Sequence, residues 1–129
     1  MKKQGILNRS LLAQIACLGH TDTFVLADCG LPIPRDIPVV DLSVVFGLPR
    51  FQPVLQALLS ELEIEACCYA SEAIGTEVES WFAEIPGTHD TISHEELKCQ
   101  VAQAAFVVRT GEDTPWANVI LRCGVPFGK

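Results

Sequence analysis

Two titratable residues flank one apolar stretch near the start of the chain. His20 directly follows a helix-like segment that stops at Gly19, and Asp28 ends the apolar run 23–28, which is typical of a buried strand. An imidazole can accept or donate a proton near neutral pH, and a carboxylate can hold a hydroxyl group through a charge-assisted hydrogen bond. The carboxyl end of such a strand is where open α/β sheets tend to bind ligands. The pattern therefore indicates an acid/base histidine and a ligand-binding carboxylate.

Both residues also have structural interpretations, and the sequence leaves them open. A histidine just after a helix-ending glycine often caps helix carbonyls, where the helix dipole favours its charged form. Asp28, which precedes Cys29-Gly30, fits the acceptor of an Asx turn equally well. With a strand between them, His20 and Asp28 can lie up to ~25 Å apart. A pocket built around His20 can therefore need another element or another subunit.

Two further candidates lie later in the chain. His94 stands at the start of a predicted helix, where it is either an ordinary surface residue or part of a site. Trp116 lies in a turn-rich connection and is either a plug of the core or a flat platform for a sugar. His89 falls in a predicted loop and has no expected role.

The sequence offers little for metal or cofactor chemistry. A metal site made of His20, Asp28 and His94 is conceivable, but Cys67 and Cys68 would point to opposite faces of a strand and could not share a zinc ion. There is no glycine-rich nucleotide motif and no Gly-x-Ser-x-Gly motif. We therefore expect no metal and no cofactor.

The elements that must position these residues alternate between strands and helices. Apolar spacing predicts helices over 10–18, 50–62, 77–85 and 93–103, and strands over 23–28, 38–42, 64–70, 104–109 and 118–123. Asn8 or Ser10 can cap the first helix, and Ser93 with Glu96 has the spacing of a capping box. The prediction is a single α/β domain over residues 1–129, with a central mixed sheet and helices on both faces.

Composition limits the classes of protein that are possible. Of 129 residues, 49% are hydrophobic and 19% charged, which excludes a disordered chain and predicts covered sheet faces or apolar surface between subunits. The net charge of −7, with scattered basic residues, argues against binding to nucleic acid or to an anionic membrane. No apolar run is long enough to span a bilayer. Without a secretory signal, six cysteines suggest reduced, buried thiols and a cytoplasmic protein.

Longer stretches of the sequence resemble a known family. The run Leu-Gly-His-Thr-Asp-Thr-Phe-Val-Leu-Ala-Asp-Cys-Gly-Leu-Pro-Ile-Pro over 18–34 closely resembles the N-terminal signature of the ribose pyranase and fucose mutarotase family. Residues 1–8, 47–55 and 109–125 follow the family pattern as well, whereas the region 71–103 looks shortened. The Leu-Pro-Ile-Pro sequence at 31–34 favours the ribose branch.

The resemblance implies roles for individual residues. His20 matches the family's catalytic proton donor, Asp28 a sugar-binding carboxylate and His94 a substrate-binding histidine. Trp116, Ala117 and Asn118 match a substrate-contacting segment that normally reads Tyr-Ala-Asn. Tryptophan in place of tyrosine removes a hydroxyl group and leaves an indole N–H.

The resemblance also implies an activity and an assembly. The activity is an isomerase that interconverts pyranose and furanose forms, and anomers, of D-ribose or a close aldose through the open-chain form, without a cofactor. The alternatives are a fucose-type mutarotase and a non-catalytic sugar-binding or regulatory subunit. The implied partners are a monosaccharide and further copies of the chain, in a homodecamer of two pentamers. Its sites would lie at subunit junctions, with the segment 116–118 of one chain facing His20 of a neighbour.

Overall fold

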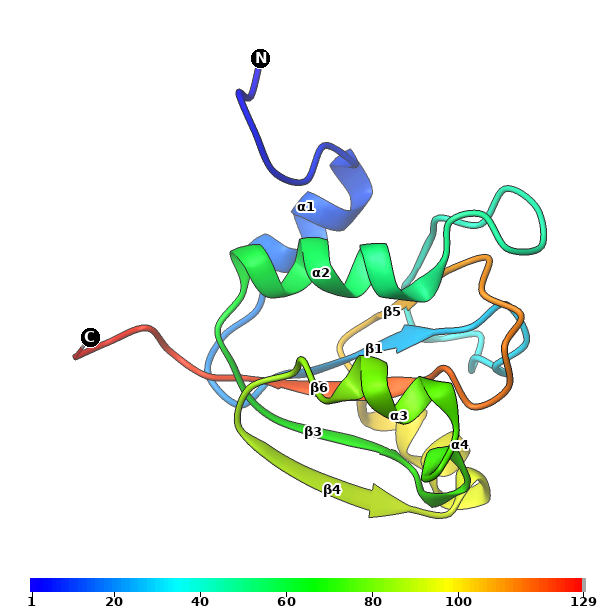
Figure 1. Ribbon diagram of the computed structural model, residues 1–129. Helices are drawn as coiled ribbons and strands as arrows, with labels where there is room; N and C mark the ends of the chain where they lie inside the picture. Colours follow the sequence, from blue (N-terminus) through cyan, green and yellow to red (C-terminus); the bar gives the residue numbers. More distant parts are fainter. Residues whose placement is uncertain (129) are drawn as a thin grey trace.

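The computed structural model describes residues 1–128, which fold around one six-stranded sheet (Figure 1). In chain order the elements are α1 (Arg9–Ala16), β1 (Thr23–Ala27), β2 (Val39–Asp41), α2 (Phe51–Glu61), β3 (Ile64–Ala70), α3 (Glu77–Phe82), β4 (Thr88–Ile92), α4 (His94–Gln100), β5 (Val107–Arg109) and β6 (Val119–Cys123). Single 3-10 turns follow β3 at Ser71–Ala73 and α4 at Val101–Gln103. No helix in this part of the chain has the length and apolarity to cross a bilayer.

The sheet is mixed, with one strand running against the others. The strand order is β2-β5-β1-β6-β3-β4, and β6 is antiparallel to its neighbours β1 and β3. The pairs β1–β5, β2–β5 and β3–β4 are parallel. Five strands therefore end at the same edge of the sheet, the edge at which β6 begins.

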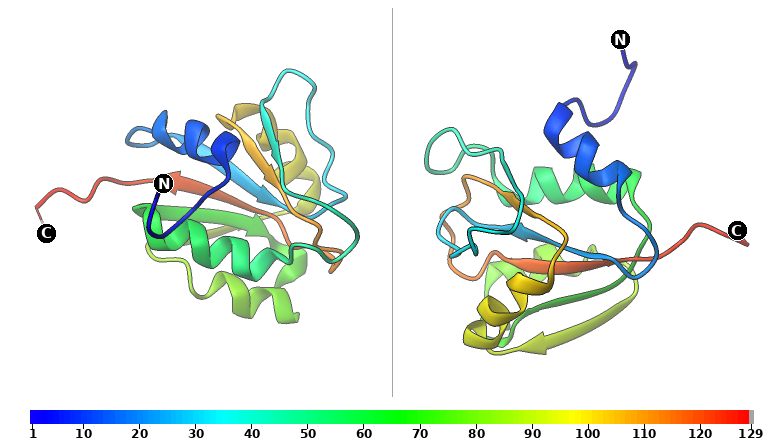
Figure 2. Two further views of the ribbon diagram at one scale, coloured as in Figure 1. Left: turned by 90° about the horizontal axis from the view of Figure 1, so that it is seen from above. Right: turned by 180° about the vertical axis from the view of Figure 1, so that it is seen from behind.

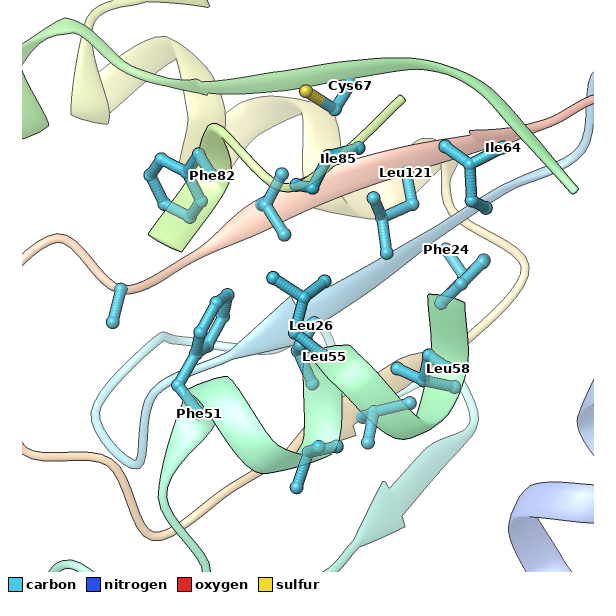
Figure 3. Close-up of a cluster of buried hydrophobic side chains, with 14 of the residues drawn as sticks. Phe24, Leu26, Phe51, Leu55, Leu58, Ile64, Cys67, Phe82, Ile85 and Leu121 are labelled. Atoms are coloured by element: carbon cyan, nitrogen blue, oxygen red, sulfur yellow. The ribbon is translucent and has the colours of Figure 1, made fainter. Parts of the chain in front are cut away.

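Helices cover both faces of the sheet, as the sequence predicts. Helices α2 and α3 lie on one face of the sheet and α4 lies on the other (Figure 2). In β1, Phe24 and Leu26 belong to the core cluster packed by α2 and α3, whereas Val25 and Ala27 belong to the cluster packed by α4. Figure 3 shows Phe24 and Leu26 against the α2 residues Leu55 and Leu58. Because successive strand residues face opposite sides, a strand buried on both faces reads as a continuous apolar run.

Caps set the starts of two helices. The side chain of Asn8 accepts a hydrogen bond from the Leu11 amide at 2.9 Å and so begins α1, which settles the choice between Asn8 and Ser10. The Ser93 hydroxyl accepts from the Glu96 amide at 3.2 Å and begins α4. Both caps satisfy amide groups that a helix leaves unpaired in its first turn.

One strand is missing from the sequence prediction. Residues 88–92 form β4, which pairs with β3 from Ala66↔Thr88 to Ala70↔Ile92, so the prediction of a loop around His89 is wrong. β4 is an edge strand whose residues are almost all exposed, because only β3 pairs with it. Thr-His-Asp-Thr has no apolar alternation, so the pattern used to predict strands gave no signal here.

The cysteines follow the prediction only in part. All six are free thiols, and Cys67 and Cys68 face opposite sides of the sheet as expected. Burial raises the pKa of Cys67 to about 12, so this thiol is unreactive near neutral pH. Cys17 and Cys99, however, are exposed, because they lie on the outer surfaces at the end of α1 and on α4.

Candidate functional site

Two pockets occupy opposite ends of the sheet. The first, called here the Asp28 pocket, has a volume of about 440 Å³ and lies where β1, β4 and β5 end and β6 begins. This is the edge at which open α/β sheets commonly bind ligands. The residues that line it are Asp28, Cys29, Gly30, Leu31, Pro32, Phe46, His94, Lys98, Glu112, Asp113, Thr114, Pro115, Trp116 and Asn118.

Asp28 is fixed by contacts to both of its carboxylate oxygens. Oδ1 accepts hydrogen bonds from the amides of Gly30 at 3.0 Å and Leu31 at 2.9 Å, which is the Asx turn anticipated from the sequence. Oδ2 accepts from the Asn118 side-chain amide at 3.0 Å, and the Asn118 Oδ1 accepts from the Asp28 amide at 2.9 Å. Asp28 therefore has the structural role of an Asx-turn acceptor, and the same hydrogen bonds fix its carboxylate in the wall of the pocket.

The segment from Trp116 to Asn118 forms a tight turn beside Asp28. Trp116 has a φ of 72°, which is uncommon for a residue with a side chain, and its carbonyl accepts a hydrogen bond from the Asn118 amide at 2.9 Å. Ala117 is fully buried and Asn118 is 1% exposed. Asn118 holds Asp28, and Ala117 lies buried within the turn. The Trp116 side chain both packs against the core and lines the pocket, and its role as a platform for a sugar stays a prediction.

His94 reaches the same pocket from the start of α4. Its ring stands edge to face with that of Trp116, with 5.1 Å between ring centroids. Its backbone amide donates to both carboxylate oxygens of Glu72, at 3.1 and 3.2 Å. The Nδ1 atom of His94 is buried and has no hydrogen-bond partner within residues 1–128. A buried polar atom without a partner costs free energy, so this nitrogen is suited to a ligand hydroxyl.

Glu112 is a buried carboxylate that the sequence analysis missed. It is 2% exposed and accepts hydrogen bonds from the Phe51 amide at 3.0 Å, Arg50 Nη1 at 2.9 Å, and the amide and hydroxyl of Thr114 at 3.2 and 2.9 Å. Burial raises the pKa of Glu112, but these hydrogen bonds outweigh it and bring the pKa below its ordinary value. Glu112 thus ties the start of α2 to the loop that carries Trp116.

The second pocket, called here the His20 pocket, lies at the opposite end of β1. Its volume is about 760 Å³, and its lining residues are Ile15, Leu18, Gly19, His20, Leu59, Ser60, Glu61, Leu62, Glu63, Cys123, Gly124, Val125, Pro126 and Phe127. His20 sits in a turn in which Thr21 has a φ of 71° and donates its amide to the Cys123 carbonyl at 2.9 Å. Backbone conformations of this kind are often found at functional sites.

The imidazole of His20 bonds to a side chain and not to a helix carbonyl. Its Nε2 lies 3.0 Å from Glu65 Oε2, and Glu65 Oε1 accepts from Arg122 Nε at 3.0 Å. The hydrogen bond with His20 and the charge of Arg122 hold the pKa of Glu65 below its ordinary value, against the opposing effect of desolvation. The alternative that His20 merely caps α1 is therefore wrong.

Within one chain the structure does not bring all of the candidate residues together. Asp28, His94, Trp116 and Asn118 share one pocket, whereas His20 lines the other, at the far end of β1. Within residues 1–128 no three histidine, cysteine or acidic side chains are placed to hold a metal ion, so the conceivable set of His20, Asp28 and His94 does not assemble in one chain.

Each pocket is bordered by an exposed aromatic side chain. Phe46 lines the Asp28 pocket and is 81% exposed, in a loop where Val44, Val45 and Leu48 are exposed as well. Phe127 lines the His20 pocket and is 79% exposed. Clustered apolar side chains of this kind commonly mark protein–protein interfaces.

A carboxylate, an imidazole and an indole around a small crevice at the ends of parallel strands define an α/β protein suited to small polar ligands. Comparison with known proteins gives the family. The chain belongs to the RbsD / FucU transport protein family, whose family model matches residues 1–126.

Individual relatives match over nearly the whole chain. A D-ribose pyranase of Cutibacterium acnes is 56% identical over 98% of this chain and 100% of its own length. The structure of Bacillus subtilis RbsD complexed with D-ribose is 43% identical, covers 98% of this chain and 100% of that chain, and superposes with a TM-score of 0.89. A fucose mutarotase from Streptococcus pneumoniae in complex with L-fucose is 20% identical over 92% of this chain and 93% of that chain. Its TM-score of 0.77 shows the same fold.

Proposed function

We propose that this chain is an isomerase that interconverts the pyranose and furanose forms of D-ribose, and its anomers, through the open-chain aldehyde. The observation that carries the proposal is the 56% identity to a D-ribose pyranase over that relative's full length. The 43% identity to a protein solved with D-ribose supports the same substrate. The fucose mutarotase is only 20% identical, so fucose is the weaker alternative.

The reaction needs proton transfers and no redox step. Opening the ring removes the proton of the anomeric hydroxyl, breaks the bond between the anomeric carbon and the ring oxygen, and places a proton on that oxygen. Closure by a different hydroxyl group adds it to the aldehyde carbon, removes its proton and protonates the carbonyl oxygen. The protons balance over the cycle. We assign these transfers to His20, because a histidine can serve as either acid or base near neutral pH.

The residues of the Asp28 pocket would bind and orient the sugar. Asp28 offers a charged acceptor to a sugar hydroxyl, and the orphaned Nδ1 of His94 offers a further polar contact. Trp116 offers a flat apolar surface and an indole N–H. Ala117 and Asn118 are both buried, so Ala117 would act by shaping the turn and Asn118 by holding Asp28.

Catalysis by His20 on a sugar held by Asp28 requires two copies of the chain. We infer a homo-oligomer, a decamer of two pentamers, in which the Asp28 pocket of one chain faces the His20 pocket of a neighbour. The two pockets lie at opposite ends of one sheet, and each is bordered by an exposed phenylalanine that such contact would cover. Six free thiols support a reducing, cytoplasmic location.

Saturation-transfer NMR on D-ribose tests the activity. Wild-type protein should accelerate exchange between pyranose and furanose signals, and His20→Ala should slow that exchange about 10²- to 10⁴-fold while calorimetry shows nearly unchanged ribose affinity. Ribose binding without exchange would instead indicate a sugar-binding subunit. Faster exchange of fucose in a panel of aldoses would indicate a mutarotase of the fucose type. Light scattering that gives the mass of a single chain would refute the assembly.

A further inference from the structure

Three side chains from three elements form a hydrogen-bonded row beside the His20 pocket. His20 comes from the turn before β1, Glu65 from β3 and Arg122 from β6. His20 Nε2 lies 3.0 Å from Glu65 Oε2, and Arg122 Nε donates to Glu65 Oε1 at 3.0 Å. Glu65 therefore stands between an imidazole and a guanidinium, with one oxygen for each.

The backbone of β3 is irregular at this point. Ile64 pairs with Cys123 and Ala66 with Arg122, so the register shifts at Glu65 and leaves it as the extra residue of a β-bulge. Bulges re-aim a side chain and are over-represented next to active sites. The bulge is an observation independent of the hydrogen bonds, and both point to a specific placement of the Glu65 carboxylate.

The chemistry of the row fixes which nitrogen of His20 carries a proton. An ionised carboxylate only accepts hydrogen bonds, and the guanidinium on the other oxygen favours that ionised form. Nε2 must then be the donor in both the neutral and the charged imidazole. In the neutral ring the free lone pair lies on Nδ1, and in the charged ring the transferable proton lies there.

We propose that Glu65 is a positioning residue for His20, which it holds as the Nε2–H tautomer so that Nδ1 is the nitrogen that exchanges protons with the sugar. This inference rests on the proposed function, in which His20 is the acid/base. The two oxygens on the anomeric carbon of a cyclic sugar are neighbours, so one nitrogen can take the proton from the hydroxyl oxygen and return it to the ring oxygen. Glu65 itself neither gains nor loses a proton in the cycle.

Nitrogen-15 NMR of the imidazoles tests the proposal directly. The chain has only three histidines, so the His20 signals can be assigned by their loss in His20→Ala. At a pH where the ring is neutral, wild-type protein should show a protonated Nε2 and an unprotonated Nδ1, and Glu65→Ala should show both tautomers. A wild-type ring protonated mainly at Nδ1, or an unchanged tautomer ratio in Glu65→Ala, would overturn the inference. This measurement needs no sugar, so it is independent of whether the isomerase function holds.

Kinetics of the variants supply the second test. Exposed pairs contribute little to stability, so Glu65→Ala should remain folded. Its kcat for ribose exchange should fall about 10- to 100-fold, with KM nearly unchanged. This is the range found when a carboxylate that orients a metal-bound histidine is removed, and we expect a similar loss here. Glu65→Gln keeps a neutral acceptor for Nε2–H and should lose less. The control Glu84→Gln replaces an exposed carboxylate that accepts a hydrogen bond from Gln52 Nε2, and its kcat should be unchanged. An equal kcat for Glu65→Ala and the wild type would refute the positioning role, while a wild type that does not exchange ribose would refute the isomerase alone.

Discussion

The carboxylate of Glu112 should contribute far more to stability than that of its neighbour Asp113, although both bind Arg50. Glu112 is 2% exposed and also accepts from the Phe51 amide and from Thr114. In Glu112→Gln one oxygen can still accept from Phe51, but the new amide nitrogen faces the Thr114 amide, donor against donor. An unsatisfied part-buried donor costs about 1–3 kcal/mol, and a neutral acceptor is weaker than a charged one, so the variant should lose about 2–4 kcal/mol of unfolding free energy.

Asp113→Asn is the matched control. The Asp113 side chain is 48% exposed and lies 2.6 Å from the same Arg50 Nη1, so its loss should cost less than about 1 kcal/mol. Urea unfolding followed by tryptophan fluorescence, at one fixed protein concentration because of the expected association, measures both variants. Equal losses in the two variants would refute the reasoning, because they would mean that burial adds nothing.

The pH dependence of the same variant follows from the sign of the pKa shift. The folded-state pKa of Glu112 lies below its ordinary value, so its ionised form stabilises the fold above the unfolded-state pKa of about 4.3. That contribution is lost as the pH falls through the lower, folded-state pKa. The stability difference between wild type and Glu112→Gln should therefore be full near pH 7 and shrink in acid. A difference that grows as the pH falls would contradict this assignment.

Two further predictions concern Asp28, the proposed sugar-binding carboxylate, and the cysteine thiols. Asp28→Asn should weaken D-ribose binding about 10- to 100-fold in calorimetry, because it loses a charged acceptor and because its new amide nitrogen must face an N–H donor on either side. Unchanged affinity would remove Asp28 from the ligand site. In native protein a thiol reagent should modify Cys17 and Cys99 quickly and leave Cys67 untouched, because Cys17 and Cys99 are exposed whereas Cys67 is buried and its pKa is raised. Peptide mass spectrometry measures the order in which the thiols are labelled. Early labelling of Cys67 would contradict the prediction.

Local patterns in the sequence were sufficient for most of the fold. The stripe of apolar residues in 50–62 predicted α2, and the apolar run 23–28 predicted β1, because each element has a buried surface with its own spacing. Strand β4 was not predicted, because an exposed edge strand of polar residues has no such spacing of apolar residues. Its existence depends on pairing with β3, which is a tertiary interaction.

Some residues of the candidate site can likewise be predicted from local sequence patterns, whereas others depend on partners far away in the chain. Asp28, with its Asx turn, and Ser93, as the cap that places His94 at the start of α4, are local features that a sequence can carry. Glu65 and Glu112 depend on partners 45 and 62 residues away, His20 and Arg50, and neither has a neighbouring residue that signals its role. The Thr-Gly-Glu sequence at 110–112 was recognisable as a family pattern. The sequence did not indicate that the buried Glu112 connects the start of α2 to the loop that carries Trp116.

The placement of the two pockets at opposite ends of β1 has a genetic consequence. Under the proposed assembly, each junction takes its imidazole from one chain and its sugar carboxylate from another. A chain with a damaged His20 and a chain with a damaged Asp28 are then each inactive alone, yet in a mixed ring some junctions receive both intact halves. The proposed assembly would therefore allow complementation between two defective alleles, which a protein with its whole site inside one chain does not allow.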